Sequence, residues 1–199
     1  MKAAITIITV TFVVSMLLYP VPAHPSEVTE QVRFTTEEVL KILKDPSLQG
    51  PEKAPARRTK LRTAIMELFD FEEMAKRSLA RHWSRRSDQE KVEFVALFRR
   101  LIERFYIEKI EKYTDEEILY VGERRQDGRA LVKTKIVTKQ GTEIPIHYRL
   151  LTKQERGWMV YDIVVEGVSL VSNYRSQFNR IIRSSSYSTL IKRLQSKVE

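Results

Sequence analysis

The chain has 199 residues, of which 42% are apolar and 31% charged, and 35 Lys and Arg against 26 Asp and Glu give a formal charge of +9. This usage is typical of one globular domain with its own core, and it excludes a disordered or membrane-embedded chain. The sequence contains no Cys, which excludes disulfide scaffolds, zinc fingers, iron–sulfur clusters and cysteine nucleophiles. The three His residues stand too far apart to indicate a histidine metal site: His24, His82 and His147.

Residues 1–23 have the pattern of a secretory signal peptide. Lys2 precedes the uncharged stretch 3–18, and Val21-Pro22-Ala23 places small or β-branched residues at −3 and −1 of a cut after Ala23. A membrane anchor is the alternative, but a spanning helix needs about 20 apolar residues, more than this stretch has. We therefore expect a cleaved leader and a single domain over residues 24–199. Because Cys is absent, the export signal favours a bacterial periplasm.

The positive charge indicates an anionic partner or a solvated basic surface. A sequence pI near 9.7 is common in nucleic-acid-binding proteins, but the export signal argues against that partner. Anionic lipid headgroups and an acidic protein partner remain open, since both are attracted by the same charge.

Helical signals fill the first half of the chain. Thr35-Thr36-Glu37-Glu38 has the spacing of a capping box and predicts the start of a short amphipathic helix. Asp70 and Ser87 are the next predicted N-caps, and Ser87 has the stronger signal because Glu90 stands at the reciprocal position. After a turn-rich connector over 46–55, the predicted helices cover residues 56–69, 71–79 and 88–113.

The helix over residues 88–113 carries a wide apolar face. Eight of its apolar or aromatic residues project to one side at 100° per residue: Phe94, Val95, Phe98, Leu101, Ile102, Phe105, Tyr106 and Tyr113. Such a face either packs into the core or lines a cavity, and the pattern alone leaves both open.

The second half of the chain changes to a period of two. Asp127-Gly128 predicts a hairpin, and the four strands expected around it and the following turns are residues 118–125, 130–139, 143–153 and 158–165. Closing helices are expected over residues 169–183 and 187–197. The predicted fold is therefore α+β: a curved four-stranded antiparallel meander with helices on one side and at both ends.

Alternation assigns residues to the two faces of the last two strands. In the third strand Ile144, Ile146, Tyr148 and Leu150 share one face, and His147 and Arg149 lie on the other. In the fourth strand, strict alternation puts Trp158, Val160 and Val164 on one face, and Met159, Tyr161, Ile163 and Val165 on the other, with Asp162 as an interruption.

An ordered set of short motifs resembles the MlaC family of periplasmic phospholipid-binding proteins, also called toluene-tolerance auxiliary proteins. The motifs are Phe69-Asp70-Phe71, Met74-Ala75, His82-Trp83, Ile144-Pro145, Tyr148-Arg149-Leu150, Trp158, Val160-Tyr161-Asp162, Glu166-Gly167-Val168-Ser169-Leu170-Val171 and Asn173-Tyr174-Arg175-Ser176-Gln177-Phe178. The resemblance implies a monomeric carrier that shuttles phospholipid between an outer-membrane lipoprotein–porin complex and an inner-membrane MCE-domain ABC transporter of a Gram-negative cell. It also implies a lipid pocket between the sheet and the helices, with bound phospholipid as cargo and no cofactor.

A lipid pocket of this kind needs apolar side chains and no catalytic group. Leaving two acyl chains of about 15 methylenes in water would cost about 24 kcal/mol, so the pocket must be nearly as apolar as a bilayer. The residues expected to line it are Phe94, Phe98, Leu101, Ile102, Phe105, Ile144, Ile146, Tyr148, Leu150, Val160, Val168, Tyr174 and Phe178. Arg149 and Arg175 are the candidates for headgroup contact, with surface pairing to Glu as the alternative.

A pocket enzyme of the isomerase or dehydratase type is the second hypothesis. In it Asp162 would act as a general base with Tyr148 or Tyr161. The alternative for Asp162 is a structural hydrogen-bond acceptor. Neither nucleophile motifs nor metal-ligand spacings are present in the sequence, so we expect no enzyme activity.

Overall fold

The computed structural model describes residues 26–112 and 116–198. The predicted signal peptide lies outside these residues. The longer elements are α1 (Glu27–Lys44), α2 (Ala54–Leu68), α3 (Phe71–Leu79), α4 (Asp88–Ile110), β1 (Glu117–Gln126), β2 (Arg129–Val137), β3 (Glu143–Lys153), β4 (Gly157–Val165), β5 (Val168–Ser169), α5 (Leu170–Ser184) and α6 (Tyr187–Val198). Short 3₁₀ turns lie at Pro46–Leu48, Pro51–Lys53 and Ala80–Arg85. The α+β fold is confirmed.

Helix α1 begins nine residues earlier than the capping-box pattern with Thr35 as N-cap predicts. Its N-cap is Ser26, and Val32 and Val28 are fully buried about one and two turns before Thr35. Thr36 does not cap a helix: its hydroxyl donates back to the carbonyl of Arg33 at 2.8 Å. The predicted start was wrong because the buried face of the helix continues upstream of a polar tetrapeptide.

Two other predicted helix starts are confirmed. Asp70 accepts a hydrogen bond from the Glu73 N–H at 3.0 Å and so caps α3. Ser87 and Glu90 form the reciprocal capping box of α4. Helix α4 ends at Ile110, slightly before the expected end, and residue 113 lies outside the described part of the chain.

The sheet has five antiparallel strands in the order β1-β2-β3-β4-β5, one more than expected. Strand β5 is only two residues long and pairs Val165 with Val168 and Val164 with Ser169. Glu166 and Gly167 form the turn between them with φ of 48° and 81°, a left-handed pair that suits a tight hairpin. Two residues are too few to produce an alternating pattern, so the sequence could not reveal this strand.

A β-bulge in β4 overturns the strict alternation expected for this strand. Leu150 faces Val160 and Arg149 faces Asp162, so Tyr161 is an extra residue opposite the same β3 segment. As a result, Val160 and Ile163 pack on the same face, in one core cluster with Leu150 and Tyr148. Asp162 and Val164 fall on the opposite face, with Arg149 and His147 as their partners.

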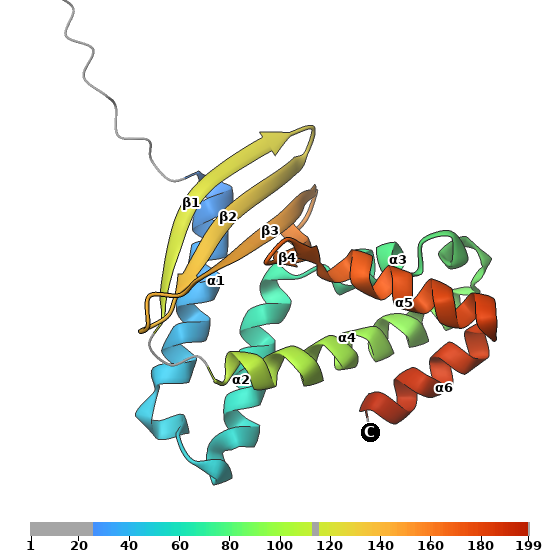
Figure 1. Cartoon of the computed structure of the whole chain (residues 1–199), viewed down its shortest axis with the longest axis horizontal. Coiled ribbons are helices and arrows are strands. Elements are labelled where there is room, and N and C mark those ends of the chain that lie inside the picture. Colours follow the sequence, from blue (N-terminus) through green and yellow to red (C-terminus); the bar gives the residue numbers. More distant parts are fainter. Residues whose placement is uncertain (1–25, 113–115, 199) are drawn as a thin grey trace, which may run out of the picture.

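The helices form two groups around the sheet (Figure 1). Helix α1 lies against one face, where Val28 and Val32 pack with Val132 and Leu150, and Leu68 at the end of α2 joins them. Helices α3 to α6 form a second core beyond the β4–β5 side of the sheet. Phe69 packs against both cores, and the Asp70 N–H donates to the Val160 carbonyl at 2.9 Å. No helix in the described ranges has the length and hydrophobicity needed to span a bilayer.

Candidate functional site

One face of the sheet is mainly apolar, but it is buried over only part of its length. Near α1, Val132 and Leu150 are 0% exposed. At the other end of the strands, the apolar side chains on the same face are half-buried or exposed and join no core cluster of the described residues. We call this group, which crosses β1 to β5, the apolar strip, and its members are Ile118, Ile136, Ile144, Ile146, Val165 and Val168.

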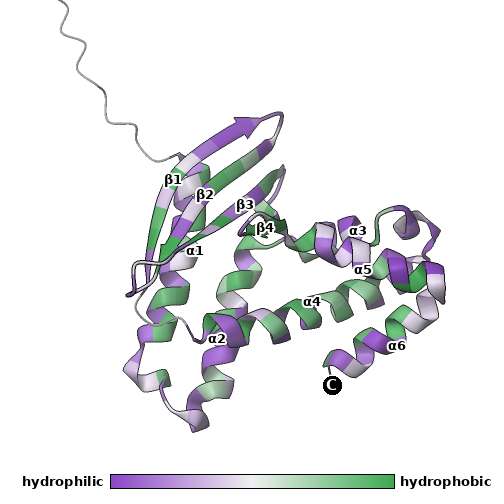
Figure 2. Ribbon diagram, viewed as in Figure 1, coloured by the Kyte–Doolittle hydropathy of each residue, from purple (hydrophilic) through white to green (hydrophobic). Residues whose placement is uncertain are grey.

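Cross-strand pairing makes the apolar strip continuous. Ile136 lies between Ile118 and Ile144 in adjacent strands, and Ile146 lies opposite Val165. Val168 extends the strip to the sheet edge and is 60% exposed. Figure 2 shows hydrophobic residues at this end of the strands. A contiguous apolar surface that the protein's own core does not cover is a feature of ligand or partner sites.

The structure places the predicted lipid-pocket residues in two separate groups. Phe94, Phe98, Tyr174 and Phe178 are packed ring against ring, with centroids 5.4–6.1 Å apart in pairs such as Phe98–Tyr174 and Tyr174–Phe178. Leu101 and Ile102 belong to the same helical core, and Phe105 is 44% exposed.

The remaining predicted pocket residues belong to the sheet. Tyr148, Leu150 and Val160 pack in the core under α1, while Ile144, Ile146 and Val168 lie in the apolar strip. The structure therefore brings the residues of each group together, one group in the helical core and the other on the sheet. That they line a lipid pocket stays a prediction.

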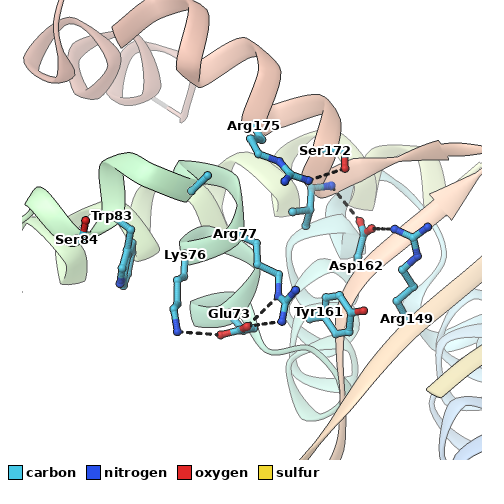
Figure 3. Close-up of a pocket in the computed structure, with 12 residues that line it drawn as sticks. Glu73, Lys76, Arg77, Trp83, Ser84, Arg149, Tyr161, Asp162, Ser172 and Arg175 are labelled. Carbon is cyan, nitrogen blue, oxygen red and sulfur yellow. Dashed lines mark hydrogen bonds and ion pairs between the residues drawn. The ribbon is translucent and has the colours of Figure 1, made fainter. Parts of the chain in front are cut away.

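The opposite face of the sheet carries a polar cleft of about 580 Å³ (Figure 3). Its walls come from α3, from the 3₁₀ turn that follows it, from β3 and β4, and from the first turns of α5. The lining residues are Glu73, Lys76, Arg77, Ala80, Trp83, Ser84, Arg149, Tyr161, Asp162, Val171, Ser172 and Arg175.

Asp162 is held by three donors at the base of this cleft. It is 3% exposed and accepts hydrogen bonds from Arg149 Nη1 at 3.0 Å, Ser169 Oγ at 2.7 Å and the Val171 N–H at 3.0 Å. The last bond satisfies a backbone N–H that has no partner within α5, and a negative charge at the N-terminus of a helix also interacts favourably with the helix dipole. Asp162 therefore acts as a structural acceptor.

The tyrosines of the enzyme hypothesis are not arranged for proton transfer with Asp162. Tyr148 lies on the other face of the sheet, and burial raises the pKa of its phenol. The ring of Tyr161 lies under Arg77, whose guanidinium carbon is 4.2 Å from the ring centroid. The geometry does not favour the enzyme hypothesis. Within the described ranges, no three His, Asp or Glu side chains are grouped as a metal site would need.

Arg77 is fixed in place by two neighbours on the rim of the cleft. Glu73 accepts from Arg77 Nε at 2.8 Å, and Lys76 Nζ lies 3.7 Å from the same carboxylate. Together with Tyr161 beneath it, Glu73 leaves Arg77 little rotational freedom.

A second cleft of about 500 Å³ adjoins the first and shares Arg149 and Tyr161 with it. It lies beside the hairpin of β1 and β2. Its lining residues are Arg124, Gln126, Asp127, Arg129, Ala130, Leu131, Arg149 and Tyr161.

The two predicted headgroup residues, Arg149 and Arg175, both line the first cleft. Arg149 alternates with Tyr148 and Leu150 along β3, so its side chain lies on the face opposite the apolar strip. Sequence reasoning missed Lys76, Arg77, Arg124 and Arg129. Only the last two had a visible signal, since they flank the predicted Asp127-Gly128 turn.

Comparisons with known proteins agree on one family and one fold. The family described as MlaC protein matches residues 33–196. The structure is also similar to a phospholipid-binding protein from Ralstonia solanacearum, solved in complex with a phospholipid at 1.53 Å resolution. That comparison has a TM-score of 0.76 and 22% sequence identity, and it covers 87% of this chain and 97% of the other. Among curated proteins there is no significant match.

Proposed function

The chain belongs to the MlaC family, and on that premise we propose that it is a phospholipid carrier that binds acyl chains against the apolar strip. The observation that carries the proposal is the strip itself: an aliphatic surface on β1 to β5 that α1 covers only at one end. The Ralstonia protein of the same fold was solved with a phospholipid, which supports this choice of ligand.

The size of the ligand explains why a broad strip is needed. Transferring the two acyl chains of a phospholipid, each of about 15 methylenes, from an apolar environment to water would cost about 24 kcal/mol. The apolar strip runs across five strands, and at a spacing of ~4.8 Å between strands it extends about 19 Å, so a chain lying across the strands is covered on one side. Cover on the other side has to come from the helices.

We expect the aromatic residues of α4 and α5 to provide part of that cover. Phe98, Tyr174 and Phe178 contact one another in the described structure, so a chain can reach these rings only if α4 and α5 move apart.

The cellular role proposed here is a shuttle through the periplasm. The chain would be exported by residues 1–23, collect phospholipid at one membrane complex and release it at another: a lipoprotein–porin complex in the outer membrane and an MCE-domain ABC transporter in the inner membrane. Since the lipid moves between two apolar environments, each transfer is nearly balanced in free energy and needs only a small bias.

Organic-solvent extraction of the purified protein, followed by mass spectrometry of the extract, tests the proposal. We expect a glycerophospholipid in near-stoichiometric amount. Refolding the delipidated protein with phospholipid vesicles should restore the bound lipid. Protein that carries no lipid after purification and takes none up from vesicles would contradict the proposal.

A further inference from the structure

The two clefts on the face opposite the apolar strip adjoin at Arg149 and Tyr161, which line both, and we call the two together the basic groove. Its lining residues come from α3 and the start of α5, from β3 and β4, and from the hairpin of β1 and β2. Its volume is about 580 Å³ on one side of Arg149 and about 500 Å³ on the other.

Cationic side chains outnumber carboxylates in the groove by six to three. The cations are Lys76, Arg77, Arg124, Arg129, Arg149 and Arg175, and the carboxylates are Glu73, Asp127 and Asp162. Glu73 and Asp162 are already engaged by Arg77, Lys76 and Arg149. In the described ranges Arg124, Arg129 and Arg175 make no ion pair, and Arg175 Nη2 donates to the Ser172 hydroxyl at 2.8 Å. The groove therefore has a surplus of positive charge that the chain itself does not neutralise.

Two of the arginines are already oriented. Arg149 is bound to the buried carboxylate of Asp162, and Arg77 is held between Glu73 and the Tyr161 ring. A guanidinium that is fixed before binding loses less side-chain entropy when an anion arrives. Its remaining N–H groups suit the paired oxygens of a carboxylate.

The shape and composition of the groove favour a protein segment over a membrane surface. Seven large apolar side chains of the described chain are exposed: Phe34, Met66, Val92, Phe105, Leu119, Val121 and Val168. None of them lines the groove, and of its two aromatic residues Trp83 is half-buried and Tyr161 lies under Arg77. A surface that inserts into a bilayer presents exposed apolar or aromatic residues instead. A concave groove also admits an extended chain more readily than a flat layer of headgroups.

We infer that the basic groove docks an extended acidic segment of a protein partner, with Asp and Glu side chains paired to Arg124, Arg129 and Arg175. The groove and the apolar strip lie on opposite faces of the sheet, so a partner could bind while lipid is held. The inference concerns a second surface and does not depend on the identity of the lipid. Charge pairing of this kind increases the association rate and selects the partner.

Binding of a fluorescein-labelled decaglutamate peptide to the purified full chain, measured by fluorescence anisotropy, tests the inference. A decaglutamine peptide serves as the neutral control. We expect decaglutamate to bind with a Kd that rises steeply with salt. Arg124→Glu/Arg129→Glu and Arg175→Glu should each weaken binding about tenfold or more. The matched controls are Lys192→Glu/Arg193→Glu on α6, which changes the net charge equally, and Arg180→Glu, an exposed position on α5 outside the groove.

The inference is overturned if the control variants weaken binding as much as the groove variants, because the attraction would then come from net charge alone. It is also overturned if decaglutamate does not bind and vesicles of phosphatidylglycerol and phosphatidylethanolamine do. Co-purifying lipid should be unchanged in folded Arg175→Glu, and its loss would place the groove in the lipid site. If a Glu variant does not fold by circular dichroism, Arg175→Ala and Arg129→Gln apply the same test with smaller expected effects.

Discussion

The carboxylate of Asp162 in β4 accepts a hydrogen bond from the backbone N–H of Val171, nine residues later, at 3.0 Å. This bond connects the last long strand to the start of α5, and through Arg149 the same carboxylate connects β3 to both. Asp162 can reach these donors because the bulge at Tyr161 turns it to the face from which α5 begins. One side chain therefore fixes where the helical core starts relative to the sheet.

We predict that Asp162→Ala destabilises the protein by about 1–3 kcal/mol. It leaves the Val171 N–H without an acceptor, which has a cost of this order, whereas Arg149 is 43% exposed and stays hydrated without its partner. Asp162→Asn, which keeps an acceptor, should have a smaller effect. Urea unfolding followed by circular dichroism measures both. Asp127→Asn in the exposed β1–β2 turn is the matched control and should change stability by less than about 0.5 kcal/mol. Equal stability of Asp162→Ala and the wild-type chain would refute the structural role.

Val168→Glu should remove bound lipid without unfolding the protein. Val168 is 60% exposed, so the empty protein can hydrate a carboxylate at this position, while a lipid chain over the apolar strip cannot. A cost of ~3 kcal/mol for placing the acid against acyl chain lowers occupancy about a hundredfold. Mass spectrometry of the solvent extract measures the lipid.

Val92→Glu is the matched control for this substitution, because Val92 is 72% exposed on α4 and lies outside the apolar strip. It should retain the wild-type lipid content. Normal lipid in folded Val168→Glu would mean that the Val168 side chain does not contact the cargo. Ile146→Glu, in the middle of the strip, should also lose lipid, with a larger loss of stability because Ile146 is half-buried.

Glu123 should make α1 sensitive to acid. Burial alone would raise the pKa of this carboxyl, but hydrogen bonds from Ser26, Thr29 and Arg125 outweigh it and lower the pKa below the ordinary value of 4.5. A depressed pKa in the folded state stabilises the protein above the ordinary value, and this contribution is lost as the pH falls through the folded-state pKa. Glu123→Gln should therefore lower the free energy of unfolding by about 2 kcal/mol at neutral pH. Below pH 4.5 the free energy of unfolding of this variant should fall less steeply than that of the wild-type chain.

Urea unfolding at a series of pH values compares Glu123→Gln with Glu117→Gln, a change of the same kind at an exposed position of the same strand. Glu117→Gln should keep the wild-type profile. Parallel profiles for the wild-type chain and Glu123→Gln would show that the contacts between Glu123 and the start of α1 do not contribute to stability.

The mature protein should begin at His24. The reason is the Val21-Pro22-Ala23 boundary after a short uncharged stretch. Expression in a Gram-negative host, release by osmotic shock and intact-mass measurement check the prediction. Replacing Ala23 with a large charged residue should prevent cleavage and keep the chain cell-associated. Shock-released protein that retains residues 1–23 would contradict it.

Local signals in the sequence were reliable where a few adjacent residues determine the structure. Asp70 and Ser87 cap α3 and α4 as expected, and Asp127-Gly128 forms the turn between β1 and β2 with φ of 49° and 68°. In each case the polar side chain or the positive φ acts within about four residues, so no distant contact is needed. The same holds for the change from helical to alternating periodicity that predicted the α+β fold.

Only the tertiary structure decided which faces meet and where the chain is open. The Tyr161 bulge depends on how β3 pairs with β4, and the start of α1 depends on Val28 and Val32 fitting the sheet, so neither can be read from nearby residues. The division of the apolar residues into a helical core, a sheet core and the apolar strip follows from those pairings. So does the basic groove, whose arginines come from β1, β2, β3, α3 and α5. Periodicity predicts which face of its own helix or strand a side chain lies on. Which other helix or strand packs against that face is determined by contacts between residues far apart in the chain.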